Sequence, residues 1–196
     1  GIVVDLSVHL KRIGRLEGQR IWVGAGVVPL VLNNHLRPHG LLFGPDPATR
    51  DRCTVGGMVG INSTGSHSLK WGDTRAKVEA LKVVTGRGES LVLKPTSLKE
   101  VEKGKGLLSS LADLARRASA VDLPFSTTLL RNRHGYLLWK AIEGDLLNPV
   151  NVFVGSEGTL GIALEALLRL DPIPEEIGIF LLRFTERRPA LSQVVP

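Results

Sequence analysis

Two glycine-rich segments constrain the fold of this chain more than any other feature of its sequence. Residues 54–65 read TVGGMVGINSTG, and residues 154–162 read VGSEGTLGI. Glycine permits positive φ angles and lets a ligand approach the main chain, so such segments form concave groups of amides that hold phosphates or the polar edge of a planar cofactor. A tight turn between strands explains either cluster alone. Two clusters, each bordered by strand-like runs, weaken that explanation without removing it.

Both segments lack the signatures of the common nucleotide-binding loops. Neither contains the G-x-G-x-x-G fingerprint after a strand, and neither ends in the Gly-Lys-Ser/Thr of a P-loop. The sequence therefore argues against an ordinary Rossmann domain and against a nucleotide hydrolase.

The composition indicates a folded, soluble piece of a longer protein. The chain has 196 residues, 43% of them hydrophobic, and it begins at Gly1 without an initiator methionine. Its single cysteine, Cys53, excludes a disulfide or a cysteine-only metal site within the chain. The net charge is +6, but the basic residues are scattered and only 5% of residues are aromatic, so nucleic-acid binding is not expected. No apolar run reaches the roughly 20 residues of a transmembrane helix. We expect a cytoplasmic protein, or one attached to a membrane through partners.

Periodicity and turn residues predict a mixed α and β chain. The clearest helix covers residues 107–121, where leucine and alanine line one face. Shorter helices are expected within residues 27–39, after the capping pair Ser97 and Glu100, and at residues 136–142. Residues 44–74 are interpreted as a long functional loop with at most one helical turn. Strands are predicted at residues 2–6, 20–24, 78–84, 90–93, 150–154, 160–170 and 177–184.

Five motifs, taken together, carry a family resemblance. They are GPDP at residues 44–47, TVGGM at 54–58, Asn62-x-x-Gly65, KWG at 70–72 and GSEGTLGI at 155–162. In order and spacing they resemble the FAD-linked oxidases of the vanillyl-alcohol oxidase / p-cresol methylhydroxylase (PCMH) superfamily. The branch most similar contains D-lactate, glycolate and D-2-hydroxyglutarate dehydrogenases.

The resemblance implies an α+β fold, a PCMH-type FAD-binding domain of two α/β subdomains with its N-terminal part missing. Residues 1–43 would be a remnant of the first subdomain and residues 44–174 the second. Residues 175–196 would begin a missing substrate domain. The cofactor implied is FAD, bound noncovalently.

The same resemblance implies which residues line the cofactor. Pro45 and Asp46 would begin a loop beside the flavin. The contact residues between positions 54 and 72 would follow the pyrophosphate, the ribityl chain and the cofactor's edge. The second segment would contact the adenosine half. The implied contact residues are Pro45, Asp46, Thr54, Gly56, Gly57, Asn62, Gly65, Ser66, Gly72, Glu157, Gly158, Thr159, Gly161 and Ile162. Trp71 stands where relatives commonly have tyrosine.

Other polar residues are weaker candidates. His67 either faces the flavin or makes a local loop contact, and the local contact is favoured. Asn132 and Tyr136 match an Asn-x-x-Gly-Tyr segment of the family, with a packing role for Tyr136 slightly favoured. Cys53 is interpreted as a packed residue and not as a flavin attachment point. The histidines lack metal-ligand spacing, so no metal site is expected, and no catalytic residue is assigned.

The resemblance implies a flavin-dependent oxidoreductase that oxidises a small 2-hydroxyacid of the D-lactate or glycolate type. A base from the missing substrate domain, or from a partner subunit, would take the hydroxyl proton. The alternative is a noncatalytic subunit or degenerate paralogue that keeps the fold as an interaction platform.

Overall fold

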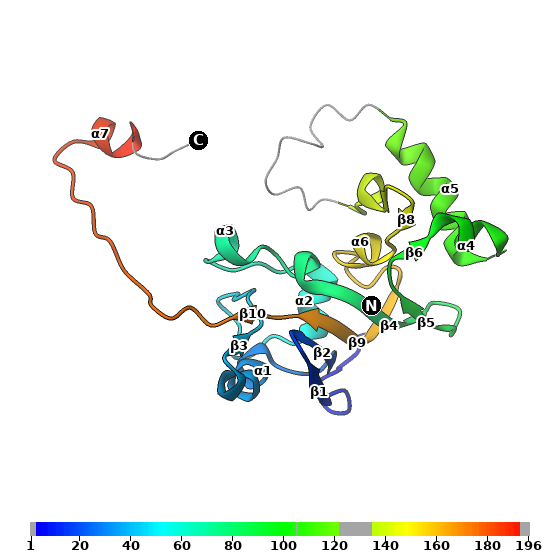
Figure 1. The fold of residues 1–196 in the computed structure, drawn as a ribbon, viewed down its shortest axis with the longest axis horizontal. Coiled ribbons are helices and arrows are strands. Elements are labelled where there is room, and N and C mark those ends of the chain that lie inside the picture. Colours follow the sequence, from blue (N-terminus) through cyan, green and yellow to red (C-terminus); the bar gives the residue numbers. More distant parts are fainter. Residues whose placement is uncertain (1–2, 105, 122–134, 193–196) are drawn as a thin grey trace.

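A five-stranded antiparallel sheet organises the part of the chain that the structure describes. The computed structural model describes residues 3–104, 106–121 and 135–192. The sheet order is β1-β2-β9-β4-β5 (Figure 1). Its strands are β1 (Ile13–Glu17), β2 (Arg20–Gly24), β9 (Gly161–Arg169), β4 (Val78–Thr85) and β5 (Ser90–Leu93). The combination of this sheet with helices confirms the predicted α+β class.

β9 is the central strand, although it is the last of the five in sequence. Ala166 of β9 lies opposite Val23 of β2 on one side and opposite Leu81 of β4 on the other. These three side chains are at most 1% exposed. Because side chains alternate between the two faces of a strand, one face of the sheet lies on the core.

The other face of the sheet is polar. Lys82 Nζ lies 2.5 Å from Glu165 Oε2 and 5.0 Å from the centre of the Trp22 ring. Arg20 pairs with Glu79 at 2.7 Å. Such partly exposed pairs contribute little stability, but they show that this sheet buries one face only, as antiparallel sheets commonly do.

Helices complete the main core with their apolar sides. Pro29 starts α1, where its missing amide is harmless, and Gly40, at φ 68°, ends the 3₁₀ turn that follows α1. The structure confirms the helix predicted within residues 27–39. The helices of this core are α1 (Pro29–Leu36), α2 (Val55–Ile61) and α6 (Val150–Phe153), whereas η1 (Arg37–His39) follows α1 and has no buried residue.

A second hydrophobic core lies beside the first. Ala112, Ala115 and Leu147 are at most 1% exposed there, and Leu108 packs against both cores. Helix α5 confirms the helix predicted at residues 107–121. The elements of this core are α4 (Leu98–Lys103), α5 (Leu107–Ser119), η3 (Leu138–Lys140) and the small sheet of β6 (Thr96–Ser97), β8 (Leu146–Leu147) and β7 (Ile142–Glu143).

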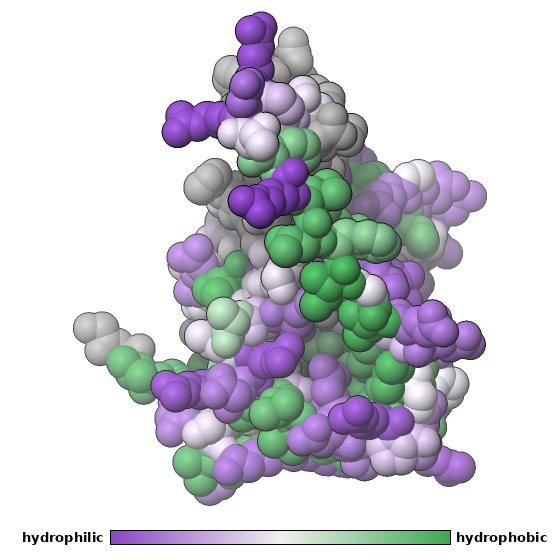
Figure 2. Space-filling model, turned by 90° about the vertical axis from the view of Figure 1, so that its left-hand side faces the viewer, coloured by the Kyte–Doolittle hydropathy of each residue, from purple (hydrophilic) through white to green (hydrophobic). Residues whose placement is uncertain are grey.

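The last described segment extends away from both cores (Figure 1). It leaves a short pair of strands, β3 (Leu41–Leu42) and β10 (Asp171–Pro172), and ends in α7 (Arg187–Ser192). Ile179, Phe180 and Leu181 are each 93% exposed, and hydrophobic side chains form a row along this side of the molecule (Figure 2). Within the described ranges, no helix has the length and apolar character needed to cross a membrane.

Three predicted strands are wrong. Residues 3–6 are irregular. The strand that pairs with β2 on its outer side is β1, whose charged sequence does not indicate a strand. Residues 150–153 form the helix α6, because Pro149 starts a turn and Asn148 Oδ1 accepts the amide of Val150 at 3.2 Å. Residues 177–184 have no secondary structure, since they have no neighbouring strand among the described residues.

The prediction of a loop at residues 44–74 is also partly wrong. It contains α2 and the shorter α3 (Ser68–Trp71), and the 3₁₀ turn η2 (Arg75–Lys77) follows it. Val55, Met58 and Val59 are at most 1% exposed, at the i, i+3 and i+4 spacing of a helix face. Their burial offsets the low helix propensity of the glycines between them.

Smaller expectations had mixed outcomes. The hairpin of β4 and β5 and the long strand β9 are confirmed. The helix after Ser97 is confirmed, but the Ser97 side chain makes no capping bond. At residues 136–142 the structure has only η3 before β7 begins. The sheet combines strands from before and after residue 43, so the three-part domain division stays a prediction.

Candidate functional site

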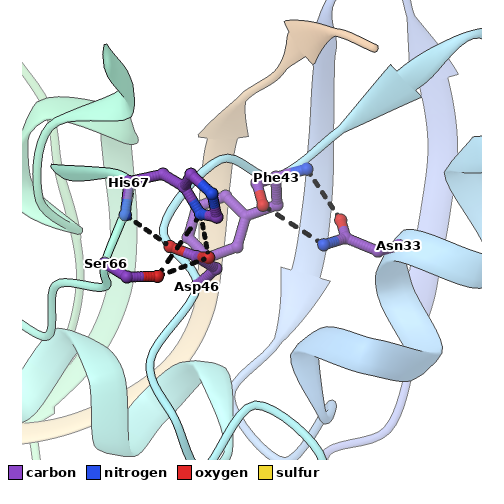
Figure 3. Close-up of polar contacts among 5 residues, drawn as sticks. All are labelled: Asn33, Phe43, Asp46, Ser66 and His67. Atoms are coloured by element: carbon purple, nitrogen blue, oxygen red, sulfur yellow. Dashed lines mark hydrogen bonds and ion pairs between the residues drawn. The ribbon is translucent and has the colours of Figure 1, made fainter. Parts of the chain in front are cut away.

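Loop 44–47 lies against the chain that follows α2. Pro45 is buried, and the Asp46 carboxylate, 16% exposed, faces residues 65–67 (Figure 3). Gly65 has no room for a side chain, because a Cβ there would overlap Oδ1 and the carbonyl oxygen of Asp46. Ser66 Oγ lies 3.5 Å from Oδ2 of the same carboxylate. The structure therefore brings Pro45, Asp46, Gly65 and Ser66 together.

The first turn of α2 uses its own amide groups. The amide of Gly56 donates to the carbonyl of Ala25 at 2.7 Å, and the amide of Gly57 donates to Thr54 Oγ1 at 3.2 Å. A Cβ at Gly56 would lie 2.8 Å from the Cβ of Ala25, so close packing requires glycine there. These amides already have acceptors. The expected contacts of Thr54, Gly56 and Gly57 with a pyrophosphate stay a prediction.

One side of α2 presents bare main chain. Gly57 and Gly60 lie about one turn apart. Beyond the helix's own main chain, no described atom lies within 4 Å of a Cβ at Gly60, and only Thr54 Oγ1, at 3.5 Å, does so at Gly57. Each glycine costs about 1 kcal/mol of helix stability relative to alanine. Packing does not account for that cost, whereas a ligand lying against α2 would.

The two glycine-rich segments are joined directly. The amide of Gly155 donates to the carbonyl of Val59 at 2.8 Å, and the amide of Glu157 donates to the carbonyl of Gly60 at 2.8 Å. The guanidinium of Arg75 donates to the carbonyl of Val154 beside this junction. Segments that lie far apart in sequence thus form one continuous surface at the end of α2.

Asn62 fixes the turn that ends α2. It is 1% exposed and adopts φ 48°, a left-handed conformation that asparagine tolerates better than most residues. Its Nδ2 donates to Asp73 Oδ2 at 2.8 Å, and its Oδ1 accepts the amide of Arg75 at 2.9 Å. Both ends of the Asn62 side-chain amide therefore have partners within the chain, so this residue holds the turn at the end of α2 in place.

The second segment turns sharply, and the side chains of its middle residues are exposed. Glu157 and Gly158 have φ angles of 53° and 79°, and residues 157–160 are exposed. The Thr159 hydroxyl donates to the carbonyl of Ser156 at 2.6 Å. The Tyr136 hydroxyl, 2.7 Å from Thr159 Oγ1, is therefore the donor in that contact. Tyr136 precedes η3 and is not a helix residue, while Asn132 lies outside the described residues.

Gly161 and Ile162 begin β9. A Cβ at Gly161 would overlap the carbonyl oxygen of Val84, so the close approach of β4 requires glycine. Ile162 is 37% exposed. β4 pairs with β9 as far as Gly161, but β2 pairs with it only as far as Glu165. Among the described strands, Ile162 thus has a neighbour on one side only.

Gly72 ends α3 and sets the position of Trp71. It has φ 75°, and its amide donates to the carbonyl of Ser68 at 2.9 Å. A Cβ at Gly44 would lie 2.8 Å from the Cβ of Trp71, so the indole packs on the start of loop 44–47. Gly72 therefore supports this loop through its neighbour.

Comparison with known proteins shows which proteins this chain resembles. A family model described as an FAD binding domain matches residues 1–94. D-2-hydroxyglutarate dehydrogenase of Pseudomonas putida is 35% identical over 97% of this chain and 20% of its own length. The protein of that name from Haemophilus influenzae is 36% identical over 89% of this chain and 18% of its own length. Glycolate oxidase subunit GlcD of Bacillus subtilis is 28% identical over 89% of this chain and 28% of its own length.

The chain is similar to FAD-linked oxidases in its motifs, and its residues 1–94 match an FAD binding domain. An alkyldihydroxyacetonephosphate synthase structure shares its fold, with a TM-score of 0.54 and 20% identity over 85% of this chain and 24% of that one. The PCMH-type fold and the FAD cofactor that the motifs imply are confirmed at the level of the family. The chain spans about a fifth of the D-2-hydroxyglutarate dehydrogenases that it matches.

The surface fits the cofactor of the FAD binding domain that residues 1–94 match. Thr64 Oγ1 and Ser156 Oγ are buried, yet neither has a hydrogen-bond partner among the described residues. Buried hydroxyls are almost always paired in native proteins. One of these lies in each glycine-rich segment, beside main chain that has no side-chain cover. A ligand with hydroxyl and phosphate oxygens, as FAD has, would supply partners that the described residues lack.

Sequence reasoning missed three residues of this site. Thr64 and Ser156 could have been found, because they are hydroxyl residues inside the two segments that the motifs mark. Arg75 could not, since no periodicity or spacing singles out the residue that fastens the carbonyl of Val154. For His67 the favoured local contact is confirmed, because its Nδ1 lies 2.5 Å from Asp46 Oδ2.

Cys53 lies immediately before the cap of α2. It packs against the main core, and burial raises the pKa of its thiol. A thiol kept protonated is a poor nucleophile, which agrees with the expected packing role and with noncovalent FAD.

Proposed function

We propose that this chain is the FAD-binding portion of a flavin-dependent oxidoreductase that oxidises a small 2-hydroxyacid. The observation that carries the proposal is the direct junction of the two glycine-rich segments through Gly155 and Glu157. It makes one surface of bare main chain from the motifs that resemble the FAD-linked oxidases. The names of the relatives, D-2-hydroxyglutarate dehydrogenase and glycolate oxidase subunit, support the substrate class.

Each region of that surface has its own part in holding the cofactor. We place the flavin end beside Pro45 and Asp46, where Gly65, Ser66 and Gly72 shape the wall. The pyrophosphate and ribityl chain lie along Thr54, Gly56 and Gly57, and Asn62 holds the turn beneath them. The adenosine half lies along the second segment, at Glu157, Gly158, Thr159, Gly161 and Ile162.

Bound FAD would supply the hydride acceptor, its N5 atom, for the carbon that carries the substrate hydroxyl. The residues of this chain bind and orient the cofactor, and none of them is assigned as the base. The hydroxyl proton goes to a group of a further domain or a partner subunit. A cytoplasmic location, or attachment to a membrane through such partners, belongs to the same proposal.

The exposed segment 177–184 supports the existence of that further domain. Its apolar side chains point to both sides of an extended chain, which is typical of a strand buried within a sheet. We place residues 175–196 at the start of the substrate domain. Amide hydrogen exchange tests this: protection at residues 177–184 in a longer polypeptide and fast exchange in this chain are expected. Fast exchange in both contradicts it.

A flavin titration tests the cofactor site. Binding of FAD to this chain, followed by flavin fluorescence, should weaken at least tenfold in Gly57→Leu, because the side chain occupies the bare side of α2. Gly104→Leu is the matched control, since a Cβ at this glycine, which follows α4 in the second core, also meets its nearest described atom at 3.5 Å. Equal affinity in the two variants contradicts the proposed site.

A second measurement tests the reaction. A longer polypeptide that includes flanking sequence should show the visible spectrum of bound flavin and reduce an artificial electron acceptor with a 2-hydroxyacid. A colourless protein that FAD does not stabilise contradicts the proposal. Activity that appears only with a partner subunit would favour the noncatalytic alternative, which the exposed apolar segment also suits.

A further inference from the structure

His67, which is outside the set of predicted contact residues, fastens two loops of the site to each other. Its Nδ1 lies 2.5 Å from Oδ2 of Asp46, and its main-chain amide donates to Oδ1 at 3.4 Å (Figure 3). Asp46 belongs to loop 44–47, and His67 follows the end of α2 by a few residues. The side chain of His67 is 64% exposed, whereas that of Asp46 is 16% exposed.

The direction of this bond is fixed by chemistry. An ionised carboxylate only accepts hydrogen bonds, so the imidazole must carry a proton on Nδ1. The neutral and the charged ring can both do so, and the neutral ring then has its lone pair on Nε2. The contact therefore depends on one ring nitrogen only.

Loop 44–47 is held at two places. At its start, Asn33 binds the main chain of Phe43 with both ends of its amide: Oδ1 accepts from the Phe43 amide at 2.7 Å, and Nδ2 donates to the carbonyl at 3.2 Å (Figure 3). Farther along, the imidazole and amide of His67 bind Asp46. Between these points the main chain of Asp46 rests on Gly65, where no Cβ fits.

We propose that His67 is a positioning residue, which holds loop 44–47 in its FAD-binding shape through the bond from Nδ1 to Asp46. This inference rests on the proposed function of the loop. His67 acts through Asp46 and makes no required contact of its own with the cofactor. The amide nitrogen of asparagine reaches nearly the place of Nδ1, whereas that of glutamine reaches the place of Nε2. Asparagine should therefore replace His67, and glutamine should not.

The tautomer of the ring tests the bond without any cofactor. Nitrogen-15 spectra of this chain at a pH where His67 is neutral should show the ring proton on Nδ1, and Asp46→Ala should abolish that preference. A proton on Nε2 in the unaltered chain overturns the inference. This result does not depend on FAD, so it separates the inference from the proposed function.

FAD affinity tests the consequence. His67→Asn should bind within about twofold of the unaltered chain, and His67→Gln and His67→Ala about tenfold more weakly, as expected for a partly exposed charge-assisted bond. His9→Ala, in an exposed turn before β1, is the control. If Asn is as poor as Ala, or all variants bind alike, the inference is overturned. If the unaltered chain binds no FAD, the proposed function fails, and the tautomer of His67 alone tests the bond to Asp46.

Discussion

Glycine has two different purposes in the two sides of this site. On the packed side, Gly56, Gly65 and Gly161 face neighbouring main chain or Cβ atoms that leave no room for a side chain. On the open side, Gly57 and Gly60 meet nothing closer than 3.5 Å beyond their own helix. The sequence alone does not distinguish these two kinds of glycine. The comparison shows that the packed glycines hold the loops together, while the open ones have their explanation outside the described chain.

The largest effect is expected on the packed side. Gly65→Ala places a methyl group into the carboxylate and carbonyl of Asp46, so the free energy of unfolding should fall by about 2–4 kcal/mol. Urea denaturation measures this fall. Gly86→Ala, at a glycine with free space around it, should change stability by less than about 0.5 kcal/mol. Equal effects at the two positions would remove the distinction between packed and open glycines.

Asn62 separates backbone freedom from side-chain bonding. Asn62→Ala loses both the left-handed preference and the hydrogen bonds to Asp73 and Arg75. The free energy of unfolding should therefore fall by about 2–3 kcal/mol. Asn62→Gly restores only the backbone freedom and should recover part of that loss. Thermal and urea unfolding of the two variants give the division. A glycine variant as stable as the unaltered chain would show that the hydrogen bonds contribute nothing.

The open side should respond in the opposite sense. Gly57→Ala and Gly60→Ala each improve helix propensity, so unfolding should become harder by about 0.5–1 kcal/mol. FAD affinity should nevertheless fall about tenfold, because a methyl group stands where the cofactor approaches. Denaturation and flavin fluorescence on the same samples measure both quantities. A variant that gains stability and keeps full affinity would contradict the placement of the cofactor against α2.

The smallest effect concerns Cys53, which packs against the main core just before α2. Burial raises the pKa of its thiol, so the folded chain favours the protonated form. The stabilisation this gives is fully present below the pKa of the unfolded thiol, about 8.5. It is lost as pH rises through the higher pKa of the folded state.

Alkylation by iodoacetamide at pH 8 measures the same property. Cys53 should react more slowly in the folded chain than in guanidinium chloride, where the thiol is exposed. The Cys53→Ser variant should lack the decline of stability at alkaline pH. Equal rates of alkylation in the folded and unfolded chain would show that Cys53 is not protected by packing.

Much of the fold was predictable because it follows local patterns. The strand-like apolar runs at residues 20–24 and 160–170, the glycine-containing loop before β5 and the leucine face of α5 each indicate one element, and the structure contains all of them. The strands predicted at residues 2–6 and 150–154 are wrong because β-branched residues also occur in exposed irregular chain and in a buried helix turn. Proline 149 and its neighbour Asn148 decided the second case.

The site was predictable in its residues and not in their roles. The motifs named the loops that meet at Gly155, Glu157 and the end of α2. They could not show that Gly56 and Gly65 are glycine for packing, because the atoms that exclude a side chain there come from Ala25 and Asp46. These contacts arise only when the chain is folded.

The position of β9 has a consequence for how this chain comes to be folded. The hairpins β1-β2 and β4-β5 can form early, but the strand that joins them is made last, at residues 161–169. Until the ribosome has released that strand, both hairpins carry an unpaired edge, and such edges invite pairing with other chains. Assembly therefore depends on contacts of long sequence separation, which slow the search for the native state. A nascent chain of this kind is most vulnerable to aggregation just before β9 emerges.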